Sequence, residues 1–191
     1  MNRKQLIGVT LIGLAAILPL EAIGSGTAVG QTAIDLATMR STALSKHNTY
    51  RAMHHNDSDM SISDSLNSSA QGWAEKLAAT GAFEHSGGPY GENIYVSYST
   101  GMAPSAATLA NNAVQSWYDE VKDYNYTNPG FSSDTGHFTQ VVWKSSTQVG
   151  CGAAQGTETI DGNQYNAFYV VCQYTPAGNM QGQFPDNVLK P

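Results

Sequence analysis

The apolar positions of the first half of the chain repeat at helical spacing. The first such series is Met39, Ala43, His47, Tyr50 and His54. Its steps of four, four, three and four place the side chains on one face of a helix. We therefore expect a helix over this stretch, ended by the polar residues 56–63.

Two more helices are predicted from the same spacing. One begins near Asp64, and Gly81 is placed to end it. Its apolar face consists of Leu66, Ala70, Trp73 and Leu77. The other begins after Pro104, and its apolar face consists of Leu109, Ala113, Trp117, Val121 and Tyr124. Glu120 lies beside that second face, where a carboxylate needs a partner. Segment 83–101, rich in Gly and aromatic residues, is expected to be a loop.

The last third of the chain has a β pattern instead. Its β-branched and aromatic segments are HFTQVVW (137–143), VGCGAAQ (149–155) and YNAFYVVCQY (165–174). Asp161-Gly162 is a hairpin-turn signal, and Cys151 and Cys172 lie equally far from it. The turn therefore predicts that the two cysteines face each other and form a disulfide.

Helices followed by antiparallel strands predict the α+β class, with helices covering the sheet. At 191 residues the chain is long enough for one domain with a core. We expect a signal peptide over 1–30, a lead-in over 31–43 and the domain over 44–191.

The signal peptide is indicated by Arg3 and Lys4 before the apolar run 6–20, with small residues after it. Cleavage is expected after Gly24 or Gly30. The alternative is an uncleaved anchor, but a run of about 15 residues is shorter than the ~20 that span a bilayer, and Pro19 interrupts it. We predict a secreted, extracellular protein with no stable membrane span after processing.

Charge excludes one class of partner. The chain has 15 acidic and 9 basic residues, and no cluster of Lys and Arg. This pattern argues against nucleic-acid binding. Two cysteines in a secreted chain are most simply one disulfide, in agreement with the hairpin register.

Two histidines and two glutamates are candidates for chemistry: His85, Glu92, Glu120 and His137. Imidazole nitrogen and carboxylate oxygen both bind zinc and other divalent cations. Spacing alone does not bring the four together, so local pairing of each residue stays open. His47 and His54 share a helix face and are interpreted as packing and hydrogen-bonding residues.

A hydrolase would need a nucleophile. Ser86 follows His85, but the chain has no Gly-x-Ser-x-Gly elbow, and its cysteines are explained by the disulfide.

Several motifs together resemble the CAP superfamily of cysteine-rich secretory, antigen 5 and pathogenesis-related 1 proteins. They are HNTYR (47–51), HS (85–86), GEN (91–93), WYDE (117–120), GHFTQVVWKSSTQVGCG (136–152) and YVVCQYTPAGNMQGQF (169–184). The resemblance covers about residues 44–188. It implies a three-layer α-β-α sandwich with a central antiparallel sheet, and a cleft lined by His85, Glu92, Glu120 and His137. Glu84 stands where relatives often have a cysteine, so no further disulfide is expected there.

The stretch YTNPGFSSDTGHFTQVVWKSSTQVGCG (126–152) is similar to the sterol-binding secreted members of fungi. The resemblance implies binding of a sterol or fatty acid without catalysis. By the same resemblance, the lipid-binding loop would contain Tyr124, Tyr126, Pro129 and Phe131. Three aromatic residues that merely cover the core edge are the alternative for this loop. The alternatives for function are a peptidase using the His/Glu cleft, and a non-catalytic ligand of an extracellular protein.

Overall fold

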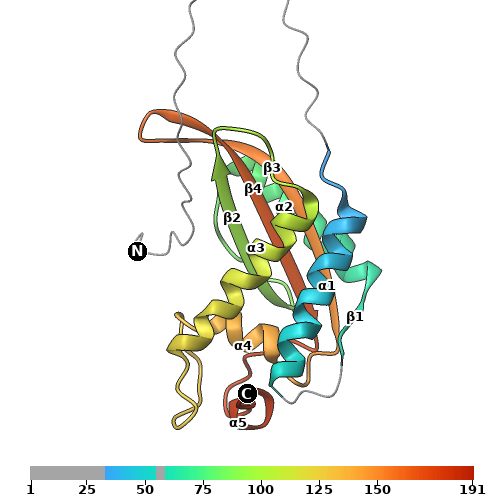
Figure 1. Cartoon of the computed structure of the whole chain (residues 1–191), viewed down its shortest axis with the longest axis vertical. Helices are drawn as coiled ribbons and strands as arrows, with labels where there is room; N and C mark the ends of the chain where they lie inside the picture. Colours follow the sequence, from blue (N-terminus) through green and yellow to red (C-terminus); the bar gives the residue numbers. More distant parts are fainter. Residues whose placement is uncertain (1–32, 55–58) are drawn as a thin grey trace, which may run out of the picture.

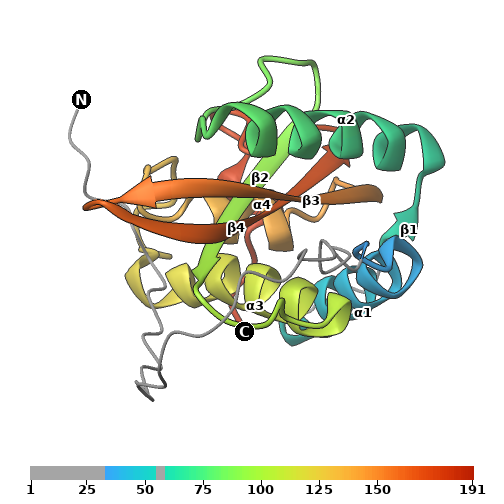
Figure 2. The same cartoon turned by 90° about the horizontal axis from the view of Figure 1, so that it is seen from above.

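The computed structural model describes residues 33–54 and 59–191 and arranges them in three layers. Helices α1 (Leu36–Met53) and α3 (Ala106–Tyr118) cover one face of a four-stranded sheet, and α2 (Asp64–Thr80) covers the other (Figures 1 and 2). The predicted α+β class and the three-layer sandwich are therefore confirmed. The expected signal peptide over 1–30 lies outside the described residues.

The first two helices begin and end where local chemistry dictates. The Asp35 side chain accepts a hydrogen bond from the Thr38 backbone nitrogen at the start of α1. Ser63 caps α2 in the same way, and Gly81 ends it in the left-handed conformation, with φ 68°. Because α1 begins at Leu36, residues 36–43 of the expected lead-in belong to a helix of the domain.

The C-terminal hairpin has the predicted register. Strands β3 (Gln148–Ile160) and β4 (Asn163–Thr175) are antiparallel, and Cys151 lies opposite Cys172. The two cysteines form the disulfide. The sheet has the order β1-β3-β4-β2, and its short strand β1 (Ser61–Ile62) runs parallel to β3. Only the three long strands are antiparallel, so the sheet is mixed.

The expected loop over 83–101 is wrong for most of its length. Residues Gly91–Ser99 form β2, an edge strand paired with β4. Alternate side chains Ile94, Val96 and Tyr98 pack in the cluster beneath α2. This period of two was obscured because Tyr95, between Ile94 and Val96, is also apolar and packs against the core beneath α1 and α3.

The expected strand over 137–143 is also wrong. Residues Gly136–Val142 form helix α4, and Phe138, Val141 and Val142 are buried at helical spacing. Burial of this face overrides the β propensity of its valines. Arg51 of α1 holds the segment that follows, because its guanidinium donates to the Trp143 carbonyl at 2.7 Å and the Ser146 carbonyl at 3.0 Å.

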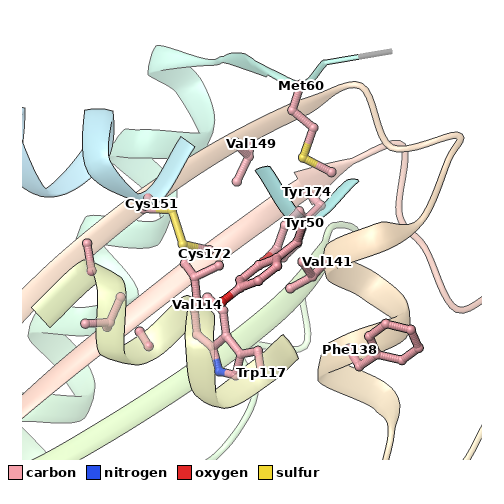
Figure 3. Close-up of a cluster of buried hydrophobic side chains, with 14 of the residues drawn as sticks. Tyr50, Met60, Val114, Trp117, Phe138, Val141, Val149, Cys151, Cys172 and Tyr174 are labelled. Carbon is pink, nitrogen blue, oxygen red and sulfur yellow. A yellow bond between two sulfur atoms is a disulfide. The ribbon is translucent and has the colours of Figure 1, made fainter. Parts of the chain in front are cut away.

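Helix α3 continues into a 3-10 turn, η1 (Asp119–Asp123), which ends before Tyr124 as the apolar spacing predicts. The short helix α5 (Phe184–Asn187) is the last helix of the described residues. Figure 3 shows the core between the sheet and α1 and α3, where the disulfide packs near Val114, Trp117 and Tyr174. No helix in the described part of the chain is long and apolar enough to cross a membrane.

Candidate functional site

A buried glutamate, Glu120, and a half-buried histidine, His137, form a pair where η1 meets α4. The Glu120 carboxylate accepts hydrogen bonds from His137 Nδ1 at 2.7 Å and from the backbone nitrogens of His137 and Phe138 at 3.0 and 3.1 Å. Its side chain is 9% exposed, and that of His137 is 26% exposed. The partner expected for Glu120 is therefore the first turn of α4, where backbone N–H groups lack helical acceptors.

His85 and Glu92 form a second pair, between the loop after α2 and the start of β2. Glu92 Oε1 accepts from His85 Nδ1 and from the Ser86 backbone nitrogen, both at 2.9 Å. Its Oε2 accepts from Gln173 Nε2 at 2.8 Å. Burial raises the pKa of Glu92, but these hydrogen bonds outweigh it and lower the pKa to about 2. The carboxylate is thus ionised throughout the physiological pH range.

In both pairs the histidine contacts the glutamate through Nδ1. An ionised carboxylate only accepts hydrogen bonds, so the Nδ1 atom that faces it carries the proton. In the neutral imidazole the lone pair is then on Nε2. The Trp117 ring stacks on His137, with centroids 6.4 Å apart, and further limits how that imidazole can turn. Each glutamate therefore orients one histidine, with the imidazole lone pair on Nε2.

Both pairs are attached to the same end of β2. Glu92 belongs to it directly, and Asn93 Nδ2 donates to the His137 carbonyl at 3.1 Å. The Trp117 indole that stacks on His137 donates to the Ile94 carbonyl at 3.2 Å. Within residues 33–54 and 59–191, however, no three His, Cys, Asp or Glu side chains are arranged to hold one metal ion. Local His–Glu pairing is thus found, while the meeting of all four residues in one cleft stays a prediction.

The interpretation of the two helix-face histidines is confirmed. His47 contacts the Ala43 carbonyl through Nδ1 and the Tyr174 hydroxyl through Nε2, at 2.7 and 2.8 Å. His54 contacts the Leu189 carbonyl and the Tyr118 hydroxyl at 2.7 and 2.9 Å. Both rings are buried structural groups.

The four residues of the predicted lipid-binding loop differ in how deeply they are buried. Tyr124 is 8% exposed and belongs to the core, with its ring 5.5 Å from that of Phe138. Tyr126 is half-buried beside it, with ring centroids 4.9 Å apart. Pro129 is half-buried too, but Phe131 is 60% exposed. Tyr124 therefore covers the core as the alternative reading expected, and Phe131 is the exposed aromatic of the loop.

Sequence reasoning missed Gln173 as a member of the His85–Glu92 site. The signal was available in the strand register, because Glu92 and Gln173 are direct cross-strand partners. It was lost because β2 was expected to be a loop.

Comparisons with known proteins identify the family. The sequence matches the CAP family, described as the cysteine-rich secretory protein family, over residues 44–174. Protein PRY2 of Saccharomyces cerevisiae is 42% identical over 147 residues, which cover 76% of this chain and 40% of PRY2. Secreted protein RBT4 of Candida albicans is 36% identical over 190 residues, which cover 91% of this chain and 48% of RBT4. The chain belongs to the CAP family, and it spans less than half the length of these two relatives.

A solved structure supports the same assignment. The crystal structure of NaASP2 with Zn2+ superposes with a TM-score of 0.60 and 26% identity, over 80% of this chain and 85% of that one. The family expected from the motifs is therefore confirmed by sequence and by fold.

Proposed function

We propose that this chain is a secreted, non-catalytic protein that holds a divalent cation, most simply zinc, in its His/Glu cleft and binds a small lipid at the loop 124–131. The observation that carries the cation site is the pair of imidazoles, each with Nδ1 on a carboxylate, which leaves the lone pair on Nε2. Zinc-binding histidines have this arrangement, since a carboxylate on one ring nitrogen fixes the tautomer and makes the other nitrogen a better ligand.

The protein supplies two nitrogen ligands in this proposal, His85 Nε2 and His137 Nε2. Glu92 and Glu120 already accept hydrogen bonds on both carboxylate oxygens, so they orient the imidazoles instead of binding the ion. Water or a bound molecule completes the coordination, because zinc accepts oxygen ligands. This division of roles agrees with the lack of a three-residue metal group in the described residues. The related NaASP2 structure with Zn2+ adds independent support.

The two pairs share one short stretch of β2 as their support. The two pairs are attached to the consecutive residues Glu92, Asn93 and Ile94. Three strand residues span roughly 7 Å at ~3.3 Å per residue. His85 lies on a loop, and its side chain is 63% exposed, so a ligand can approach it from solvent.

Calorimetric titration of the metal-free protein tests the cation site. We expect one zinc ion per chain, and no binding in the His85→Ala, His137→Ala double variant. The matched control is Glu84→Ala, which removes an exposed negative charge beside His85 but no ligand. Equal zinc binding by wild type and the double variant would make the two pairs purely structural.

The lipid site is favoured by Phe131, which is large, apolar and exposed. Its ring lies close over Gly136, the residue before His137, where an added Cβ would be only 3.1 Å from the ring. Covering a phenylalanine side chain with an apolar ligand contributes about 1.5–3 kcal/mol when the burial is complete, and proportionally less for a ring already partly covered. A flat sterol or a fatty-acid chain offers such a surface.

A sterol-binding assay with purified protein tests this site. Phe131→Ala is expected to weaken binding about tenfold, which corresponds to the ~1.4 kcal/mol expected for a 60% exposed ring. Phe83→Ala is the matched control, because Phe83 is 53% exposed on another loop. Unchanged binding in Phe131→Ala, or equal losses in both variants, would remove the loop from the proposal.

The absence of catalysis belongs to the same proposal. The Ser86 hydroxyl accepts a hydrogen bond from the Gly88 backbone nitrogen, and the His85 nitrogen that lies in a hydrogen bond faces Glu92. A serine nucleophile would instead need its hydroxyl on the imidazole. Turnover of peptide substrates that is lost in Glu120→Gln would favour the peptidase alternative.

A further inference from the structure

We infer that Gln173 is a positioning residue that fixes the Glu92 carboxylate and, through it, sets the tautomer of His85. The inference rests on the proposed cation site for its effect on metal affinity, but not for its effect on His85. Gln173 lies on β4 and is 2% exposed. Its amide nitrogen donates to Glu92 Oε2 at 2.8 Å, while His85 Nδ1 occupies Oε1.

The strand register explains why Gln173 can hold Glu92. Gly150, Gln173 and Glu92 are direct neighbours across β3, β4 and β2, so their side-chain positions share one face of the sheet. At Gly150 the backbone of α2 takes the place of a side chain, because an added Cβ would be 2.2 Å from the Asn67 nitrogen. Gln173 is therefore packed between the start of α2 and the carboxylate, and its amide has little freedom to turn away.

The amide oxygen of Gln173 indicates which hydrogen bond determines the orientation of the amide. Gln173 Oε1 is buried and has no hydrogen-bond partner among the described residues. An unsatisfied buried acceptor costs about 1–3 kcal/mol. Flipping the amide would place Oε1 against the acceptor-only carboxylate, so the observed orientation serves Glu92 and leaves Oε1 without a donor. A group kept at such a cost is expected near a functional site.

Loss of the Gln173 hydrogen bond would affect His85 through the Glu92 carboxylate. The other pair differs, since Glu120 is held by two backbone N–H groups of α4 as well as by His137 Nδ1. The Glu92 carboxylate has one backbone donor, from Ser86 in the loop, and the Gln173 amide is the donor that holds it against β4. Without that amide, the carboxylate can rotate with the loop and His85 Nδ1 loses a fixed acceptor.

The test uses the whole metal-free chain with Gln173→Met, an unbranched replacement of similar size. Long-range ¹H–¹⁵N spectra in alkaline buffer, where imidazole is neutral, report which ring nitrogen of His85 carries the proton. We expect Nδ1–H in wild type and a mixture of tautomers in Gln173→Met. Zinc affinity should fall by up to about 10–100-fold, which is the loss typical when the hydrogen-bond partner of a metal-binding histidine is removed. Gln164→Met, an exposed position on the same strand, should change neither quantity.

Gln173→Asn provides a second variant, because it keeps an amide but shortens its reach, and it should act in the same direction. An unchanged His85 tautomer in whichever of these variants folds overturns the positioning role, whatever the zinc result. Mixed tautomers in a protein whose wild type binds no zinc would instead support the role of Gln173 and contradict the proposed cation site.

Discussion

Acidification should destabilise this protein through one buried imidazole. His47 is 0% exposed, and the Ala43 carbonyl accepts from its Nδ1, which leaves Nε2 to accept from the Tyr174 hydroxyl. A proton on Nε2 would take away the acceptor of the Tyr174 hydroxyl and bury a charge. Burial lowers the pKa of His47 to about 4, a shift that the hydrogen bond to Ala43 opposes and the Arg51 charge reinforces.

The sign and size of the effect follow from linkage. Between about pH 6.5 and pH 4 the unfolded chain binds a proton at His47 that the folded chain excludes, so the free energy of unfolding falls as pH falls. Above pH 6.5 both states are neutral at this residue, and its contribution is complete. A pKa difference of about 2.5 units corresponds to roughly 3 kcal/mol lost by pH 4, at 1.36 kcal/mol per unit.

Urea unfolding at several pH values between 7 and 4 measures this loss. His47→Gln is the comparison, since its amide oxygen can accept from Tyr174 but does not titrate. All other titrating groups are shared by the two proteins, so the difference between their pH profiles isolates His47. Between pH 7 and pH 4, we expect the free energy of unfolding to fall by roughly 3 kcal/mol more in the wild type than in His47→Gln. Parallel profiles would refute the assignment of His47 as a buried neutral imidazole.

Two further predictions concern packing and cross-linking. Replacing Cys151 and Cys172 with alanine should lower the free energy of unfolding by about 3 kcal/mol, because the disulfide closes a loop with a sequence separation of 21; an equally stable variant in urea would contradict this. Gly150→Ala should cost about 1–3 kcal/mol, since its Cβ would meet the α2 backbone at 2.2 Å. Gly72→Ala is the control, because an added Cβ at this position in α2 would have nothing within 4 Å, and it should stabilise the protein by up to ~1 kcal/mol. Equal effects of Gly150→Ala and Gly72→Ala in thermal melts would show that the close approach at Gly150 is unimportant.

The elements that were predictable are those with a local physical signal. Helix α2 follows from apolar residues at helical spacing, a serine cap and Gly81 at its end. The register of β3 and β4 follows from Asp161-Gly162, because a two-residue turn fixes every pair on both sides of it, Cys151 and Cys172 included. Both signals lie within the segments that they describe.

The elements that were missed depend on distant parts of the chain. Helix α4 has strand-like residues, and its conformation is set by burial of Phe138 and by the contact of its first turn with Glu120. Strand β2 is defined by pairing with β4, whose partner residues lie 67 to 83 positions later in the chain. The four candidate residues were found by their chemistry, but their division into two carboxylate–imidazole pairs required the three-dimensional arrangement.

X-ray absorption at the zinc edge tests the central claim most directly, because it reports which atoms surround the bound ion. For the zinc-loaded chain we predict nitrogen and oxygen ligands at about 2.0–2.1 Å, with the scattering pattern of two imidazole rings. The pattern of one ring should remain in His85→Ala and in His137→Ala. A zinc environment without imidazole, or one that is unchanged by both substitutions, would contradict the claim that these two histidines hold the ion.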